Sequence, residues 1–156
     1  MAGVLERNVA IRRYGAADQD FVAALAALAF RDFEKNPALT TLRMLRPPSL
    51  TLIANRGEEP AGFVIVEPHA AGLASIQAIA VAPGERCRGV GTRLLGAALA
   101  AARRAGAREI RLCTAQANVE ALSLFLKHRF AIVRRMPRFY PRGQDACLLA
   151  CKLEDV

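Results

Sequence analysis

The sequence lacks the features that mark metal-binding, secreted and membrane proteins. It has no tryptophan and two histidines, and its four cysteines form no Cys-x-x-Cys pair and have no histidine at ligand spacing. A metal site is therefore not predicted. No apolar run approaches the ~20 residues that a membrane-spanning helix needs, and no apolar stretch follows Glu6 and Arg7. We expect a cytoplasmic protein whose cysteines are small, buried and reduced.

The composition also excludes a disordered chain and leaves room for one folded domain. Of the 156 residues, 53% are hydrophobic and 23% are charged, which supplies enough apolar material for a full core. The chain contains no internal repeat, linker or low-complexity block apart from a bias toward alanine. We expect a single domain over residues 1–156.

Lysine is scarce, and the basic charge is carried by arginine. The chain has 3 lysines and 19 arginines, and its net charge is +8. Residues 1–78 hold 8 basic and 8 acidic side chains, whereas residues 79–156 hold 14 basic and 6 acidic ones. Because arginine grips phosphate oxygens in a fixed geometry, this excess favours a polyanionic partner for the second half. A solvated basic surface is the alternative that composition alone leaves open.

Hydrophobic periodicity predicts a mixed α+β protein. The expected order is β-α-α-β-β-β-α-β-α-β-β, with a parallel pair of strands at the centre of an otherwise antiparallel sheet. Asp18 is the expected N-cap of the first helix, which fades near Asn36. The remaining helices are expected at residues 38–46, 89–105 and 118–129, and the strands at residues 8–14, 49–54, 61–67, 73–81, 108–114, 130–136 and 146–153.

A glycine-containing loop between a strand and a helix is the most informative segment. The strand ends with Ile79-Ala80-Val81, two arginines follow, and Gly89 and Gly91 open a helix. Unpaired N–H groups at a helix start bind anions, and glycine lets phosphate oxygens approach the backbone. A Walker A loop is excluded because no Gly-Lys-Ser/Thr occurs. A dinucleotide-binding fingerprint is excluded because Leu94 stands where a third glycine is required.

Two segments resemble one known family and follow that family's order. Arg86-x-x-Gly89-x-Gly91, directly after the strand, resembles the pyrophosphate-binding motif Gln/Arg-x-x-Gly-x-Gly/Ala of the GCN5-related N-acetyltransferase (GNAT) family. Residues 118–130 are similar to the family's Asn-x-x-Ala-x-x-Leu-Tyr-x-x-x-Gly-Phe stretch. The resemblance covers residues 73–153. Within it, residues 134–153 are similar to the subfamily that acetylates protein N-terminal amines, including the ribosomal-protein alanine acetyltransferase.

The resemblance implies that acetyl-CoA lies in a V-shaped split between two central parallel strands. The backbone of residues 79–81 would pair with the pantetheine arm, and one of its N–H groups would steady the thioester carbonyl. Amides of residues 87–92 would cradle the pyrophosphate, arginines would neutralise the ADP phosphates, and Asn118 would bond to the arm. The residues assigned in this way to acetyl-CoA are Ile79, Ala80, Val81, Arg86, Cys87, Arg88, Gly89, Val90, Gly91, Thr92, Asn118 and Phe125.

Two positions depart from the pattern of the N-terminal acetyltransferases. Phe125 stands where the family commonly has an acidic tyrosine, and Cys113 stands where the relatives use a glutamate base. Tyr140, on the loop between the last two strands, is the candidate catalytic residue, placed either at the sulfur or at the acceptor mouth. A lost general acid typically slows such a reaction by 10²- to 10⁴-fold and does not forbid it.

The free energy of deprotonation narrows the class of acceptor. Deprotonating an α-amine of pKa ~7.8 at pH 7 costs ~1 kcal/mol, whereas a lysine amine of pKa ~10.4 costs ~4.6 kcal/mol. Without a strong base, an amine of low pKa is favoured. We expect an acetyl-CoA-dependent N-acetyltransferase that acts on a primary amine, at a protein N-terminus or on a small molecule. The acceptor would bind between residues 30–46 and residues 136–143.

Other readings follow from the same residues. A catalytically weak acyl-CoA-binding or regulatory module is the alternative that Phe125 and Cys113 motivate. The sequence leaves the oligomeric state open, a homodimer included. Nucleic-acid binding is not favoured because few aromatic residues stand between the arginines that would carry it, which are Arg129, Arg134, Arg135, Arg138 and Arg142.

Overall fold

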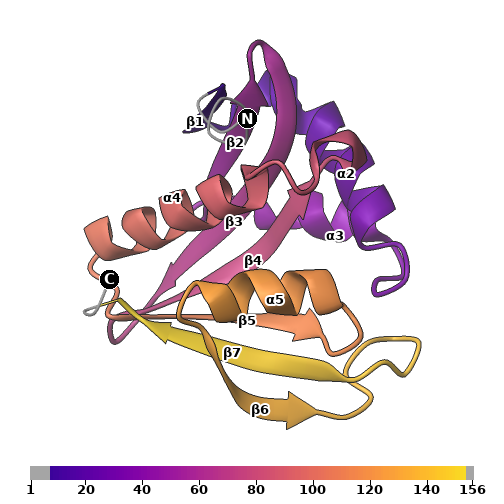
Figure 1. The fold of residues 1–156 in the computed structure, drawn as a ribbon, viewed down its shortest axis with the longest axis vertical. Helices are drawn as coiled ribbons and strands as arrows, with labels where there is room; N and C mark the ends of the chain where they lie inside the picture. Colours follow the sequence, from indigo (N-terminus) through magenta and orange to yellow (C-terminus); the bar gives the residue numbers. More distant parts are fainter. Residues whose placement is uncertain (1–7, 154–156) are drawn as a thin grey trace.

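The computed structural model describes residues 8–153 and contains one seven-stranded sheet with helices on both faces (Figure 1). The strands lie in the order β1-β2-β3-β4-β5-β7-β6. The β4–β5 pair is parallel and the other neighbouring pairs are antiparallel. The predicted α+β fold, its element order and its central parallel pair are confirmed.

The elements have the following bounds. The strands are β1 (Val9–Arg13), β2 (Leu50–Arg56), β3 (Glu59–His69), β4 (Leu73–Val81), β5 (Glu109–Ala115), β6 (Ala131–Met136) and β7 (Ala146–Lys152). The helices are α2 (Gln19–Ala29), α3 (Pro37–Met44), α4 (Val90–Arg104) and α5 (Val119–Lys127), with short 3-10 turns η1 (Ala16–Asp18) and η2 (Pro83–Glu85).

The first helix differs from the prediction at both ends. The Asp18 side chain does not cap α2, because it accepts hydrogen bonds from the Gly15 N–H (2.8 Å) and from both terminal nitrogens of Arg12 (2.7 Å each). At the other end, α2 stops at Ala29, where the C-cap residue Phe30 leaves the helical conformation (φ −110°, ψ 14°), and the amides of Phe33 and Glu34 then donate to the Phe30 carbonyl in a turn. Residues 30–36 are therefore a loop that is free to border a site.

Each face of the sheet has its own hydrophobic core. Helices α4 and α5 pack on one face, with Leu94, Leu95 and Phe125 among the buried side chains. Helix α2 packs on the opposite face of β2, β3 and β4, where Val22 meets Phe63 and the surrounding residues. Figure 1 shows α4 and α2 on opposite sides of these strands, with α5 beside β5. Strand β4 lies between the two cores and contributes buried residues to both.

The cysteine prediction is right for two residues and wrong for two. Cys147 and Cys151 are buried, whereas Cys87 and Cys113 are exposed, and all four are free thiols. Cys87 is exposed because it lies in the loop before α4, and Cys113 because its side chain leaves the sheet on the face opposite α5. Within residues 8–153, no helix has both the length and the apolar composition needed to cross a membrane.

Candidate active site

The two central strands separate after a short stretch of pairing. β4 and β5 are paired only at Leu73 with Glu109, Ala74 with Ile110, and Ser75 with Arg111. Beyond this point they diverge, as Figure 1 shows, and the facing backbone edges of both strands are left without a sheet partner. Buried backbone groups need hydrogen-bond partners, so this split is suited to an extended ligand.

A β-bulge in β4 lies where the split begins. Ile65 of β3 pairs with Ala78 and Val66 pairs with Ile76, which leaves Gln77 as an extra residue in β4. Bulges bend a strand and are enriched beside active sites. The sequence carries no signal for this bulge, because the alternation of apolar residues continues through it.

The hydrogen-bond alternation of β4 shows which residues face the split. The Ala82 amide donates to the Ala61 carbonyl at 2.8 Å, and successive residues of an antiparallel strand alternate in direction. Ala80 therefore bonds to β3, whereas Ile79 and Val81 turn their N–H and C=O groups toward the split. Of the three residues expected to pair with the pantetheine arm, only Ile79 and Val81 are so oriented.

The loop before α4 presents a run of unpaired amides. Cys87 and Gly89 have φ angles of 62° and 83°, in the left-handed region, and Gly89 is the N-cap of α4. Among the described residues, none accepts a hydrogen bond from the backbone N–H groups of residues 86–92. Together with the positive end of the α4 dipole, these amides form a site suited to phosphate oxygens.

Gly91 has a packing role in the same loop region. A Cβ at Gly91 would lie 3.3 Å from Cδ2 of Leu124 in α5 and 3.7 Å from Cγ2 of Val81. The glycine therefore lets the first turn of α4 approach α5 and β4 closely. This close packing is a structural reason for a glycine at position 91. It is separate from the predicted role of Gly91 in phosphate approach, which stays a prediction.

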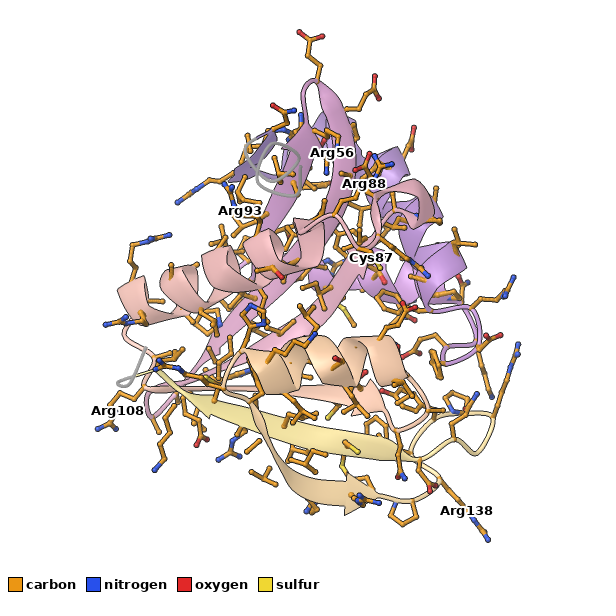
Figure 2. All side chains as sticks on the ribbon, viewed as in Figure 1. Arg56, Cys87, Arg88, Arg93, Arg108 and Arg138 are labelled. Atoms are coloured by element: carbon orange, nitrogen blue, oxygen red, sulfur yellow. The ribbon has the colours of Figure 1, made fainter. Side chains whose placement is uncertain are left out.

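Arginines surround this loop. Arg86 and Arg88 are exposed on it, and Figure 2 shows Arg88 and Cys87 beside the start of α4. Arg56 of β2 donates from its Nε to the Glu85 carboxylate at 2.5 Å, with both side chains more than three-quarters buried. This ion pair fixes η2 to the β2–β3 hairpin and sets where the loop begins.

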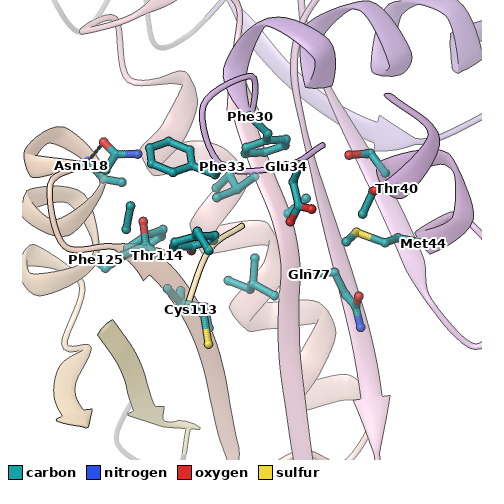
Figure 3. Close-up of a pocket in the computed structure, with 18 residues that line it drawn as sticks. Phe30, Phe33, Glu34, Thr40, Met44, Gln77, Cys113, Thr114, Asn118 and Phe125 are labelled. Carbon is teal, nitrogen blue, oxygen red and sulfur yellow. Dashed lines mark hydrogen bonds between the residues drawn. The ribbon is translucent and has the colours of Figure 1, made fainter. Parts of the chain in front are cut away.

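A pocket occupies the mouth of the split (Figure 3). Its floor comes from β4 and β5, one side from α5, and the other side from the loop after α2 and from α3. Asn118 and Phe125 border it from α5, and Tyr140 enters from the β6–β7 loop. The full lining is Phe30, Phe33, Glu34, Thr40, Thr41, Met44, Ile76, Gln77, Ala78, Ile79, Leu112, Cys113, Thr114, Ala115, Asn118, Ala121, Phe125 and Tyr140.

The two loops expected to hold the acceptor meet at this pocket. The rings of Phe33 and Tyr140 lie 5.3 Å apart between centroids. The Gln144 amide donates to the Asp32 carbonyl at 2.6 Å, and the Arg142 guanidinium lies 3.7 Å from the Asp32 carboxylate. These contacts join the α2–α3 loop to the β6–β7 loop.

Asn118, the N-cap of α5, and Phe125, within α5, both line the pocket. The Asn118 carboxamide oxygen caps α5 by accepting from the Ala121 N–H at 3.3 Å, which leaves its NH₂ group for the pocket. Phe125 is 2% exposed and packs on Phe130, with ring centroids 5.7 Å apart. Phe125 therefore supplies an apolar wall at a position where it has no hydroxyl to donate.

The pKa values of two side chains in the pocket, Tyr140 and Cys113, are both raised. Burial, together with repulsion from the nearby Cys113, Glu34 and Cys147, raises the pKa of Tyr140 to about 12. Burial also raises the pKa of the Cys113 thiol, although the positive charge of Arg134 opposes that shift. Both groups are consequently protonated at neutral pH and neither is a base.

Several lining residues were not predicted individually from the sequence. Glu34, Thr40 and Met44 reach the pocket only because the α2–α3 segment folds over the end of β4. Glu34 is the one carboxylate among the described lining residues. A lone glutamate after a helix carries no recognisable sequence signal, so only the tertiary contacts identify it.

Comparison with known proteins agrees with this geometry. The family model of the acetyltransferase (GNAT) family matches residues 16–130, which is well over half of the chain. No curated protein matches the chain by sequence.

Solved structures share the fold at low sequence identity. The ribosomal-protein-S18-alanine N-acetyltransferase from Escherichia coli has a TM-score of 0.79 and 19% identity, over 93% of this chain and 94% of that chain. Ard1 from Thermoplasma volcanium has a TM-score of 0.82 and 23% identity, over 93% and 97%. The yncA protein of Salmonella typhimurium, solved with its cofactor acetyl-CoA, has a TM-score of 0.80 and 17% identity, over 96% of each chain.

The split between β4 and β5, the open amides before α4 and the family match agree with one another. The resemblance stated from the sequence is confirmed at the level of the family. This chain belongs to the acetyltransferase (GNAT) family and is an acyltransferase whose co-substrate is acetyl-CoA.

Proposed function

We propose that this single domain transfers an acetyl group directly from acetyl-CoA to a primary amine, at a protein N-terminus or on a small molecule. The observation that carries the proposal is the pocket at the mouth of the split. Its β4 side offers the Ile79 backbone, and its opposite side offers Glu34 and Tyr140. A thioester and an amine would therefore meet between these groups.

The residues of the split and loop fit acetyl-CoA. Ile79 and Val81 offer backbone groups along the split, and Asn118 offers its NH₂ group from α5. The amides of residues 86–92, with the Arg86 and Arg88 guanidinium groups, fit a diphosphate. The open strand edge and the open amides lie along one continuous path from β4 to α4, which is the path an extended nucleotide thioester requires.

Acetyl-CoA supplies an activated acyl group, and the chain contributes positioning and charge stabilisation. The Ile79 N–H would stabilise negative charge that develops on the thioester carbonyl oxygen. The Glu34 carboxylate would hold the acceptor amine in the pocket, and the amine would lose its proton to solvent. In the balanced reaction a carbon–nitrogen bond forms, the carbon–sulfur bond breaks, and the proton lost by nitrogen ends on sulfur or in solvent.

The pocket favours an amine that is largely deprotonated without help. Cys113 and Tyr140 are both protonated at neutral pH, so neither can remove a proton from a lysine amine, whose deprotonation at pH 7 costs ~4.6 kcal/mol. An α-amine requires only ~1 kcal/mol. The α-amine of a polypeptide or of an amino acid is therefore the better acceptor.

Tyr140 is better suited to donate a hydrogen bond than to give up its proton. With a pKa of about 12, full transfer to a thiolate of pKa ~8.5 is uphill by nearly 5 kcal/mol. A hydrogen bond to a charged group contributes about 1.5–3 kcal/mol. We assign Tyr140 the role of stabilising the departing sulfur while keeping its proton.

A coupled assay tests the proposal against a binding module without activity. The protein is incubated with acetyl-CoA and a panel of peptides and small amines, free thiol is followed with a chromogenic disulfide, and products are weighed by mass spectrometry. Amine-dependent thiol release together with a product heavier by one acetyl group is expected. Saturable binding of acetyl-CoA without such release, for every amine, would favour the weak acyl-CoA-binding module instead.

A further inference from the structure

The face of β5, β7 and β6 that lies opposite α5 is an uncovered surface that begins at the pocket. Cys113 pairs with Leu148, and Leu148 pairs with Arg134. Paired residues of neighbouring strands point to the same side, so these three side chains form one row across the sheet. Cys113 and Arg134 are exposed, and Cys113 also lines the pocket. We call this row the acceptor row.

The pocket borders the acceptor row at Cys113, which lines the pocket and is exposed. The contact of Phe33 with Tyr140 and the hydrogen bond of Gln144 to Asp32 join the two loops over the pocket. The exposed side chain of Cys113 marks where the pocket continues onto the sheet face. The part of an acceptor that follows its amine would therefore lie over the acceptor row.

Opposite charges stand at the two ends of this path. Glu34 lies in the pocket, where the amine would sit, and Arg134 lies at the far end of the row. Arg111, on the same face, already pairs with Glu109 at 2.6 Å. By contrast, no carboxylate of residues 8–153 lies within ion-pair distance of Arg134. Its charge is close enough to the pocket to act on the Cys113 thiol.

We propose that the preferred acceptor is an amine that carries an anionic group, which Arg134 binds while Glu34 faces the amine. This inference rests on the proposed function and adds the substrate class. Two strand spacings place the Cα atoms of Cys113 and Arg134 about 10 Å apart. An extended peptide rises about 3.4 Å per residue, so an acidic side chain at its second or third residue falls over the row.

The test compares acceptors that differ only in charge. The peptides Ala-Glu-Glu-Ala, Ala-Gln-Gln-Ala and Ala-Lys-Lys-Ala are assayed with acetyl-CoA, each with an amidated C-terminus. In a second arm of the experiment, free glutamate and glutamine are compared, which tests whether the acceptor is a small molecule. We expect kcat/KM to be roughly three- to tenfold higher for the acidic peptide than for the neutral one, and lower still for the basic peptide. Raising the salt to about 0.5 M should shrink the preference, because exposed charges are screened.

A matched pair of variants assigns the preference to the row. Arg134→Glu should abolish or reverse it, with acetyl-CoA affinity unchanged. Arg135→Glu is the control, because Arg135 is exposed on the same strand but pairs with Cys147, on the opposite face of the sheet. Both substitutions change the net charge equally, so only a local effect separates them.

The outcomes separate this inference from the function on which it rests. A charge preference lost in Arg134→Glu and kept in Arg135→Glu supports it, in whichever arm the preference is seen. Thiol release without any charge preference, or with equal loss in both variants, overturns the inference and leaves the proposed function intact. Binding of acetyl-CoA without thiol release for any amine overturns both.

Discussion

Gly89 offers the sharpest test of the phosphate loop, because a control glycine lies at the other end of the same helix. Gly89 has a φ of 83° and N-caps α4, and Gly106 has a φ of 90° just after α4 ends. A side chain in this backbone region costs about 1–2 kcal/mol at either position. Both Gly89→Glu and Gly106→Glu should therefore lower the melting temperature of the free protein by roughly 2–8 °C.

Only the change at Gly89 should affect the co-substrate. A carboxylate about 5 Å from a phosphate charge, at an effective dielectric constant of about 20, is unfavourable by about 3 kcal/mol. The Kd for acetyl-CoA should then rise by at least roughly 100-fold in Gly89→Glu. In Gly106→Glu it should remain within about twofold, because a Cβ at Gly106 meets nothing within 4 Å and the loop is a helix length away.

Isothermal titration with acetyl-CoA, together with thermal unfolding with and without it, measures both effects. Unchanged acetyl-CoA affinity in Gly89→Glu would refute the assignment of this loop to the phosphates. It is equally refuted if Gly106→Glu loses binding to the same extent, since the loss would then come from backbone strain alone.

Four further predictions concern Tyr140, Arg56 and Asp18, and two of the four are about Tyr140. Tyr140→Phe should lower kcat by roughly 10- to 150-fold with acetyl-CoA affinity unchanged; a smaller loss than threefold would leave Tyr140 a packing residue. Because burial raises the pKa of Tyr140 to about 12, its ionisation should produce no fall in rate below about pH 11, which a pH–rate profile checks. Arg56→Gln leaves the Glu85 carboxylate unpaired beside the phosphate loop, so the Kd for acetyl-CoA should rise by about tenfold, and an unchanged titration would contradict this. The hydrogen bonds from Arg12 lower the pKa of Asp18 in the folded protein. They therefore stabilise the fold fully at pH values above ~3.9, the pKa of an aspartate in the unfolded chain. This stabilisation is lost as the pH falls through the lower pKa that Asp18 has in the folded protein. Asp18→Asn should reduce the free energy of unfolding by about 1–2 kcal/mol at pH 7 and flatten its dependence on pH below 4, as denaturant titrations would show.

Local sequence patterns were enough to predict most of the helices and strands. Strand β4 has the predicted bounds, because a glycine turn begins it and Ala82-Pro83 ends it. The first helix was expected to continue to Asn36 because its alanine-rich spacing carries no stop signal. In the structure α2 ends at Ala29 and a turn follows at Phe30.

The candidate site likewise has one part that local sequence predicts and one part that it does not. The loop with Gly89 and Gly91 is encoded within one short segment, so its chemistry can be read directly from the residues. Glu34 and Tyr140 meet only through contacts such as Gln144 to Asp32, which join positions 112 residues apart. Short-range periodicity contains no information about such contacts. Tyr140 and the acceptor segments at residues 30–46 and 136–143 were expected from the sequence, whereas Glu34 and the contacts between the two loops required the tertiary structure.

The brief pairing of β4 with β5 leaves the two halves of the sheet connected by only three residue pairs along these strands. Beyond them, the half that contains β5, α5, β7 and β6 is joined to the first half through packing and through the contacts between the α2–α3 and β6–β7 loops. A ligand that bonds along Ile79 and Val81 would act as a wedge between the halves and stiffen both. Amide hydrogen exchange at these two residues should accordingly slow on co-substrate binding, whereas strands β1 and β2 should keep their exchange rates.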